Sequence, residues 1–201
     1  MEHLSLFLLW CSFCLFHSFL ASDWIKQKIK SITGIYYSYY RVSYSVFAIL
    51  HLTIVLVYQF SIPDKLLWQI SFLIEFIAIL CGGLGIVIML ISIHKYFFNL
   101  SGIHVFAKQS ASSILQRDVM HRFTRHPLYL GTLIVVWSLL VLFPYLKNLV
   151  ASLTMTAYTL IGIRMEERKL LVEYGESYKK YIREVPRLSP KIYRRKKRVS
   201  P

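Results

Sequence analysis

Long apolar stretches separated by short polar segments dominate the sequence. Each stretch is close to the length that a helix needs to cross a bilayer, about 17 to 25 residues. We expect membrane helices over residues 4–22, 42–61, 67–93, 127–146 and 149–163. Because only a short turn separates the last two stretches, these helices are expected to form a hairpin. The pattern predicts an all-α, polytopic integral membrane protein with about five transmembrane helices and a cytoplasmic tail helix.

The chain shows no internal repeat and no low-complexity linker, which favours a single domain over residues 1–201. Within it we expect N-terminal helices over 1–93, a cytoplasmic loop over 94–126, the hairpin over 127–163 and a cytoplasmic tail over 164–201. Loops and tails outside the bilayer can form hydrogen bonds to water through their backbone N–H and C=O groups.

Composition supports the membrane interpretation, and charge adds an orientation. The chain is 56% hydrophobic, yet its formal net charge is +14. Nearly all basic residues fall on alternate connections and on the tail, and only Lys65 and Lys147 fall on the opposite side. By the positive-inside rule the N-terminus lies outside and the C-terminus in the cytoplasm, and we expect the inner membrane of a bacterium.

The basic run RRKKR, Arg194–Arg198, could indicate binding to nucleic acid or to lipid. A basic tail close to a membrane helix is typical of contact with anionic headgroups. We therefore expect membrane lipids, and no nucleic acid, as its partner.

The third apolar stretch has two unusual features. It carries CGGLG at residues 81–85, where glycines allow a close contact between helices or a kink. It also carries Glu75, a carboxylate that is costly inside a bilayer. Glu75 stands early in the stretch, so a position near the outer interface would explain it without a functional role.

The fourth stretch begins with TRHPLYLG, Thr124 to Gly131, which predicts a helix start. Proline is well tolerated at the first helical position, so Pro127 marks the start and His126 lies near the N-cap. The free N–H groups there attract anions, and the adjacent Arg125 adds a full charge suited to a carboxylate or phosphate. Two interpretations stay open: an anion site, or ordinary interfacial anchors.

A second charged cluster, Glu166 and Glu167, follows the fifth stretch at the same membrane boundary. The hairpin should bring it close to Arg125. Helical spacing places Glu167 on an otherwise apolar face, whereas Glu166 points toward water with Lys169. The face comprises Ile163, Glu167, Leu170, Leu171, Tyr174, Tyr178 and Tyr181. Simple ion pairing on a solvated helix remains an equal alternative for Glu166.

The residues also resemble a known family. RHPLYLG, followed after the hairpin by EER and then YGESYKKYIREVPRLSP, is similar to the C-terminal signature of integral-membrane methyltransferases related to isoprenylcysteine carboxyl methyltransferase. FHSFLAS, YYRVSYSVFAIL, HKYFFNLSGIHVF and TAYTLIGIRMEER are similar to segments of the methanethiol S-methyltransferase and NnrU-like branch. Together these segments cover most of the chain.

The resemblance implies methyl transfer from S-adenosylmethionine, without a metal, to a small thiol or to a prenylcysteine or lipid acceptor. It implies cofactor binding by Arg125, His126, Tyr129, Glu166 and Glu167, with Arg125 and Glu167 as catalytic residues. Arg125 and the helix start suit the cofactor carboxylate, a glutamate such as Glu167 its ammonium, and Tyr129 its adenine. His126 or Glu167 could accept a thiol proton.

Departures from the pattern leave other functions open. The lead-in RDVMHRFTRHP has Val119 and His121 where the family has glycine and tyrosine. One alternative is a non-enzymatic NnrU-like accessory protein. Another is a small haem-binding electron-transfer subunit that uses intramembrane histidines such as His17, His51 and His94. The depths of His17 and His51 match poorly, which favours histidines that pair within the helix bundle.

Overall fold

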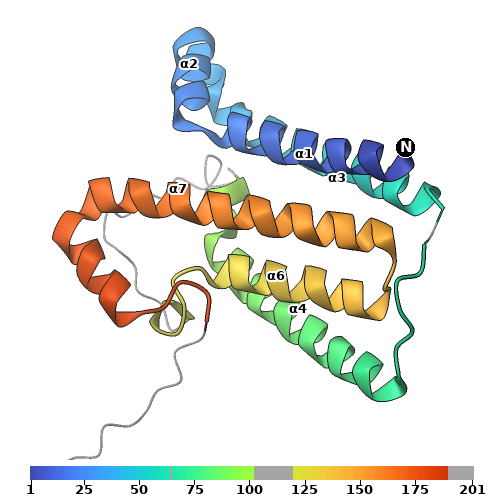
Figure 1. Ribbon diagram of the computed structural model, residues 1–201. Coiled ribbons are helices and arrows are strands. Elements are labelled where there is room, and N and C mark those ends of the chain that lie inside the picture. The colour runs from blue at the N-terminus through green and yellow to red at the C-terminus, as the bar shows by residue number, and fades with distance from the viewer. Residues whose placement is uncertain (64, 102–119, 190–201) are drawn as a thin grey trace, which may run out of the picture.

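The computed structural model describes residues 1–63, 65–101 and 120–189, which form helices joined by short connections (Figure 1). The α-helices are α1 (Glu2–Ala21), α2 (Asp23–Thr33), α3 (Tyr37–Ser61), α4 (Phe72–Ser101), α6 (Pro127–Leu142) and α7 (Leu146–Glu184), with 3-10 turns η1 (Gly34–Tyr36) and η2 (Met120–Arg122). Within these residues the only β pairing is an isolated bridge between Leu66 and Tyr145. The all-α fold class is confirmed.

The described helices include four that are long and apolar enough to cross a membrane: Glu2–Ala21, Val42–Ser61, Phe72–His94 and Leu146–Glu184. The hairpin's first helix, Pro127–Leu142, is apolar but shorter. The protein is therefore an integral membrane protein. Its longest helix, α7, has 39 residues and is interrupted by a kink at Gly175; the straight part before the kink, Leu146 to Tyr174, is roughly 43 Å long at the usual rise and so already exceeds a bilayer core.

Two expected boundaries were wrong because of one turn. The fourth apolar helix ends at Leu142 and not near 146, since Pro144 lacks an N–H and disfavours helix in the residue before it. Residues 67–71 are not helical, and the Leu67 N–H donates to the Pro144 carbonyl at 2.8 Å. The start of the third expected span therefore pairs with the hairpin turn.

The bundle packs in two halves. In Figure 1, α1 lies beside α3 and next to α7, while α6 lies between α7 and α4. The first half has a core of Leu6, Trp10, Phe13, Cys14, Val55, Ile62 and Ala151. The hairpin helix α7 therefore joins the N-terminal helices to the second half of the bundle.

Glycines bring α4 and α6 together, as expected from CGGLG. A Cβ on Gly131 would lie 2.8 Å from the Gly85 carbonyl oxygen, and a Cβ on Gly85 would lie 3.0 Å from that of Gly131. Real Cβ atoms do not tolerate the shorter distance. Close backbone contact between the two helices thus requires glycine on both sides.

The expected cytoplasmic loop over 94–126 is described only in part. Val119 and the basic run Arg194–Arg198 lie outside the described residues. Glu75 lies exposed in the first turn of α4, at the start of the candidate span Phe72–His94.

Candidate functional site

The start of α6 is built as the sequence predicts. Pro127 occupies the first turn and His126 is the N-cap residue. The turn η2 precedes it, and the Thr124 side chain accepts a hydrogen bond from the His126 N–H at 3.4 Å. The imidazole of His126 and the guanidinium of Arg125 are both held in the interior, at 3% and 7% exposure.

Glu167 meets this helix start from α7, as the hairpin argument predicts. Its Oε1 lies 3.2 Å from Arg125 Nη2 and 3.1 Å from His126 Nε2. A carboxylate only accepts hydrogen bonds, so His126 donates from Nε2 and leaves Nδ1 as its second ring nitrogen. Ile163 lies on the same buried face one turn earlier. Tyr178 and Tyr181, expected on this face as well, are buried but follow the break in the helix at Gly175, so the single face expected over 163–181 is interrupted there.

The segment after α7 closes the cluster from the other side. Arg187 Nη2 donates to Glu167 Oε2 at 2.6 Å, and its carbonyl accepts a hydrogen bond from Thr124 Oγ1 at 2.9 Å. The Arg125 N–H donates to the Pro186 carbonyl at 3.0 Å. Residues 186 and 187 are therefore bound to the start of α6 through main chain and side chain.

A kink in α7 makes this closure possible. Gly175 has φ 50° and ψ −123° inside the helix, a conformation open to glycine but strained for other residues. Beyond it the chain turns back toward the start of α6, as Figure 1 shows. There the Tyr181 hydroxyl donates to the His121 carbonyl at 2.7 Å, and Tyr178 and Val185 pack beside it.

The charges around Glu167 set its ionisation. Burial by itself would raise the pKa of the Glu167 carboxyl. Hydrogen bonds from Arg187 and His126, together with the charge of Arg125, outweigh burial, so the pKa lies below its ordinary value. Glu167 is thus a buried, ionised carboxylate with both oxygens engaged by cationic or donor groups.

Glu166 is placed quite differently from its neighbour. Its side chain is 46% exposed, and its Oε2 lies 3.7 Å from His126 Nδ1, beyond hydrogen-bond distance. Tyr129 lies in the same corner, with its ring 5.6 Å from that of His126. All five residues expected at the site are therefore close together. The Glu166 carboxylate is half exposed and within hydrogen-bond reach of the Tyr129 hydroxyl, whereas the Glu167 carboxylate is buried among cationic groups.

Two groups in the site have buried polar atoms that lack a hydrogen-bond partner among the described residues. They are Arg125, through Nε and Nη1, and the hydroxyl of Tyr178, a residue that is 1% exposed. Buried donors are nearly always satisfied in native proteins, so these atoms point to a polar ligand. Their chemistry matches an anion such as a carboxylate.

A groove of about 870 Å³ between α1 and α7 reaches this corner. Its lining is apolar over most of its length and includes Leu4, Phe7 and Ile161. At its end stands Gly162, where a Cβ would lie 3.9 Å from the Tyr129 hydroxyl. The groove is thus linked to the charged cluster through the contact of Gly162 with Tyr129, although no residue of the cluster lines it.

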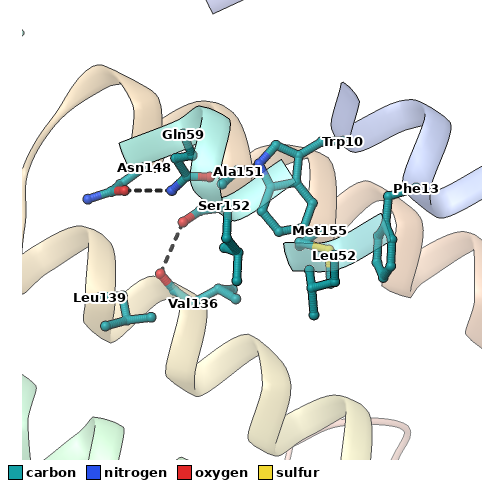
Figure 2. Close-up of a pocket in the computed structure, with 11 residues that line it drawn as sticks. Trp10, Phe13, Leu52, Gln59, Val136, Leu139, Asn148, Ala151, Ser152 and Met155 are labelled. Atoms are coloured by element: carbon teal, nitrogen blue, oxygen red, sulfur yellow. Dashed lines mark hydrogen bonds between the residues drawn. The ribbon is translucent and has the colours of Figure 1, made fainter. Parts of the chain in front are cut away.

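A second cavity, of about 340 Å³, lies away from the cluster (Figure 2). Its polar lining residues bond to one another: Trp10 Nε1 donates to Gln59 Oε1, and Gln59 Nε2 donates to Asn148 Oδ1, both at 2.9 Å. Ser152 Oγ donates to the Val136 carbonyl at 3.0 Å. These bonds tie α1, α3, α6 and α7 together and leave an apolar cavity.

The intramembrane histidines contact neighbouring helices. His17 Nδ1 lies 2.9 Å from the Tyr44 hydroxyl, and His51 Nε2 lies 3.1 Å from Ser12 Oγ. Both contacts join α1 to α3. This arrangement matches histidines that pair within the bundle.

Sequence reasoning missed Arg187, and it assigned Tyr178 only to packing. Arg187 follows a proline beyond the tail helix, where no periodic pattern places it near Glu167. The kink at Gly175 brings it there. Two signals could have indicated this: the isolated glycine within a helical pattern, and the stretch YGESYKKYIREVPRLSP, which resembles the family signature and contains Arg187.

The sequence is similar to that of known proteins. The family described as NnrU protein matches residues 5–194 of the chain. Methanethiol S-methyltransferase 2 of Bradyrhizobium diazoefficiens is 31% identical over 138 residues, which is 65% of this chain and 52% of that protein. Methanethiol S-methyltransferase of Crocosphaera subtropica is 32% identical over 135 residues, 64% of this chain and 50% of that protein.

The chain spans about half the length of these curated relatives. No solved structure matches it significantly.

Proposed function

The chain belongs to the NnrU protein family, and we propose that it is a membrane methyltransferase that moves a methyl group from S-adenosylmethionine to a small thiol. The observation that carries this proposal is the pair of buried atoms on Arg125 that lack a partner among the described residues, in a cluster with two glutamates. Relatives named methanethiol S-methyltransferase support the reaction class and the acceptor class.

The residues fit the cofactor's amino-acid end. Arg125 and Tyr178 carry buried polar atoms that would satisfy its carboxylate. Glu166, half exposed and without a short contact to a cation in the described structure, is the carboxylate that suits the ammonium better than Glu167. Glu167 then acts as a positioning residue, because it fixes Arg125, His126 and Arg187 at once. The Tyr129 ring would face the adenine or the sulfonium.

When bound, S-adenosylmethionine would supply a methyl group on a positively charged sulfur. A thiolate would bond to the methyl carbon, and the cofactor sulfur would leave as a neutral thioether. The chain's residues must align the acceptor, exclude water and remove the thiol proton. Since His126 donates from Nε2 to Glu167, its Nδ1 is the nitrogen that would accept this proton. A base oriented by a buried carboxylate is a recurring arrangement in nucleophilic catalysis.

The groove between α1 and α7 suits a small apolar acceptor that dissolves in the bilayer. Its end at Gly162, against Tyr129, is next to His126. A prenylated cysteine would have to present its carboxylate at the same place, and a phospholipid its headgroup amine. The experiment compares these acceptors directly.

The test is calorimetric binding of S-adenosylmethionine to the detergent-purified chain, followed by transfer assays with methanethiol, a prenylcysteine and phospholipid. We expect Arg125→Ala and Glu166→Gln to weaken cofactor binding roughly 10- to 100-fold, the cost of a lost charged hydrogen bond. Arg168→Ala, which removes an exposed arginine of the same helix, is the matched control and should bind normally.

Absence of binding by a folded chain would reject the enzyme and favour an accessory protein. A haem band in the absorbance spectrum of the same sample would instead favour electron transfer. Because Glu166 is half exposed, its variant should fold even if the Arg125 variant does not.

A further inference from the structure

A short helix that the hydropathy pattern does not reveal lies at the end of the bundle that carries the candidate site. This is α2, Asp23–Thr33, with the sequence DWIKQKIKSIT. Ser22 caps its start by accepting a hydrogen bond from the Ile25 N–H, and Gly34, at φ 54°, ends it. In Figure 1, α2 runs across the direction of α1 and projects beyond the bundle.

The apolar residues of α2 gather on one face. Ile25, Ile29 and Ile32 stand three or four residues apart, the spacing of a helix stripe. Ile25 is buried against the bundle, but Ile32 is 73% exposed and the neighbouring Trp24 is 61% exposed. The helix thus presents apolar side chains that the described protein leaves uncovered.

Lysines surround this face, and the single acidic residue of α2 is already neutralised. Lys28 and Lys30 are exposed, and the Lys28 ammonium lies 5.2 Å from the centre of the Trp24 ring. Asp23 forms ion pairs with Lys169 of α7 at 2.7 Å and with Lys26 at 3.6 Å. Lys28 and Lys30 therefore contribute positive charge that no carboxylate of α2 offsets.

The location of α2 decides what covers it. Asp23 follows directly on the candidate span Glu2–Ala21, and Lys169 is two residues beyond Glu167, so their ion pair joins α2 to the end of the bundle where we expect the spans to leave the bilayer. A helix that lies across the spans at this level, with Trp and Ile beside Lys, matches the chemistry of the headgroup region. Lysines can extend to phosphates while their carbon chains stay against the apolar layer.

We propose that α2 is an interfacial helix that binds anionic phospholipid, with Trp24 and Ile32 at the acyl boundary and Lys28 and Lys30 on the headgroups. This contact is separate from the basic run at the C-terminus and does not depend on the proposed reaction. It also gives the bundle a membrane anchor that is tied through Asp23–Lys169 to the helix carrying Glu167.

The experiment uses the full chain in two sets of phosphatidylcholine vesicles. One set contains acyl-brominated phosphatidylglycerol, and the other contains the same fraction of acyl-brominated phosphatidylcholine. Bromine quenches tryptophan at short range, and subtracting the signal of Trp24→Phe isolates Trp24. We expect Trp24 to be quenched by both lipids, with phosphatidylglycerol preferred roughly fivefold or more, the effect of one lysine near an anionic surface. Raising the salt concentration should reduce this preference.

The double variant Lys28→Gln/Lys30→Gln should lose the preference while Trp24 remains quenched. The control Lys180→Gln/Arg183→Gln removes two exposed charges from α7 and should keep it. Equal quenching by both lipids in the unaltered chain would overturn the proposal, as would a preference that survives in the double variant. The proposal would also be overturned if Trp24 were not quenched at all, or if its quenching fell as the protein density in the vesicles rose, because protein and not lipid would then cover α2.

Discussion

Two adjacent glutamates show how much a single position decides. Glu166 and Glu167 have the same chemistry and nearly the same sequence context, yet one is half exposed and the other is surrounded by Arg125, His126 and Arg187. One helical step, about 100° around the axis, separates their directions. Their expected roles differ accordingly: Glu166 faces a ligand, and Glu167 organises the residues around it.

Replacing Glu167 with Gln should destabilise the protein at neutral pH, because Arg125 would keep a buried charge without a counter-charge. The pKa of Glu167 lies below its ordinary value of 4.5, so its stabilising effect is complete above that value and is lost as the pH falls through the folded-state pKa. Melting temperatures should therefore differ most at pH 7 and converge toward pH 3.

Glu166→Gln is the matched control for this measurement and should melt within a few degrees of the unaltered chain. A gap between the unaltered chain and the Glu167 variant that stays constant down to pH 3 would show that packing, and not charge, explains the effect.

At the scale of elements, glycine is needed at two positions for different reasons: one is a contact between two helices, and the other is a turn within a helix. Gly131 allows α6 to touch α4, where a side chain would collide with the Gly85 carbonyl. Gly175 allows α7 to turn, although a Cβ there would meet nothing within 4 Å. At Gly131 a side chain is excluded by lack of space, whereas at Gly175 it is disfavoured by the backbone conformation.

Gly131→Ala should lower the melting temperature, because relieving the 2.8 Å approach to backbone requires the helices to separate. Overpacking of this kind costs about 1–3 kcal/mol. Gly83→Ala in the facing helix α4 has open space around its Cβ and serves as the control in thermal unfolding. Equal melting temperatures for the two variants would contradict the close contact of α4 and α6.

Gly175→Ala should act on the site more than on the bundle. A residue with a side chain at φ 50° and ψ −123° is strained by about 1–3 kcal/mol, so the kink should relax and draw Arg187 away from Glu167. Limited proteolysis should then cut more rapidly within 176–189, and cofactor binding should weaken. Unchanged proteolysis and binding would mean that the tail reaches the site without this kink.

The whole molecule has two chemically different ends. One carries Arg125, Glu166, Glu167, Arg187 and the Asp23–Lys169 pair, and the other carries the Leu66–Tyr145 bridge next to Lys65 and Lys147. Among the described residues, Lys65 and Lys147 thus lie at the end of the bundle opposite the candidate site. The positive-inside rule assigns the first end to the cytoplasm.

Orientation can be tested with reporters fused at the C-terminus. We expect a fused green fluorescent protein to fluoresce and a fused alkaline phosphatase to be inactive, because the strongly basic side is retained in the cytoplasm. A fusion after Lys65, between α3 and α4, should give the opposite result. Active phosphatase at the C-terminus would reverse the orientation and place the site outside.

The sequence alone determined the membrane class, the hairpin, the helix start at Pro127 and the face of Glu167, because hydropathy and helical spacing are local properties of the chain. Tertiary structure decided which charges meet. Arg187 reaches Glu167 only because the helix turns at Gly175, and both oxygens of Glu167 are engaged only once three separate segments converge. It also revealed α2, whose eleven residues are too short and too charged for a hydropathy signal. Contacts between distant segments depend on packing, which no local pattern specifies.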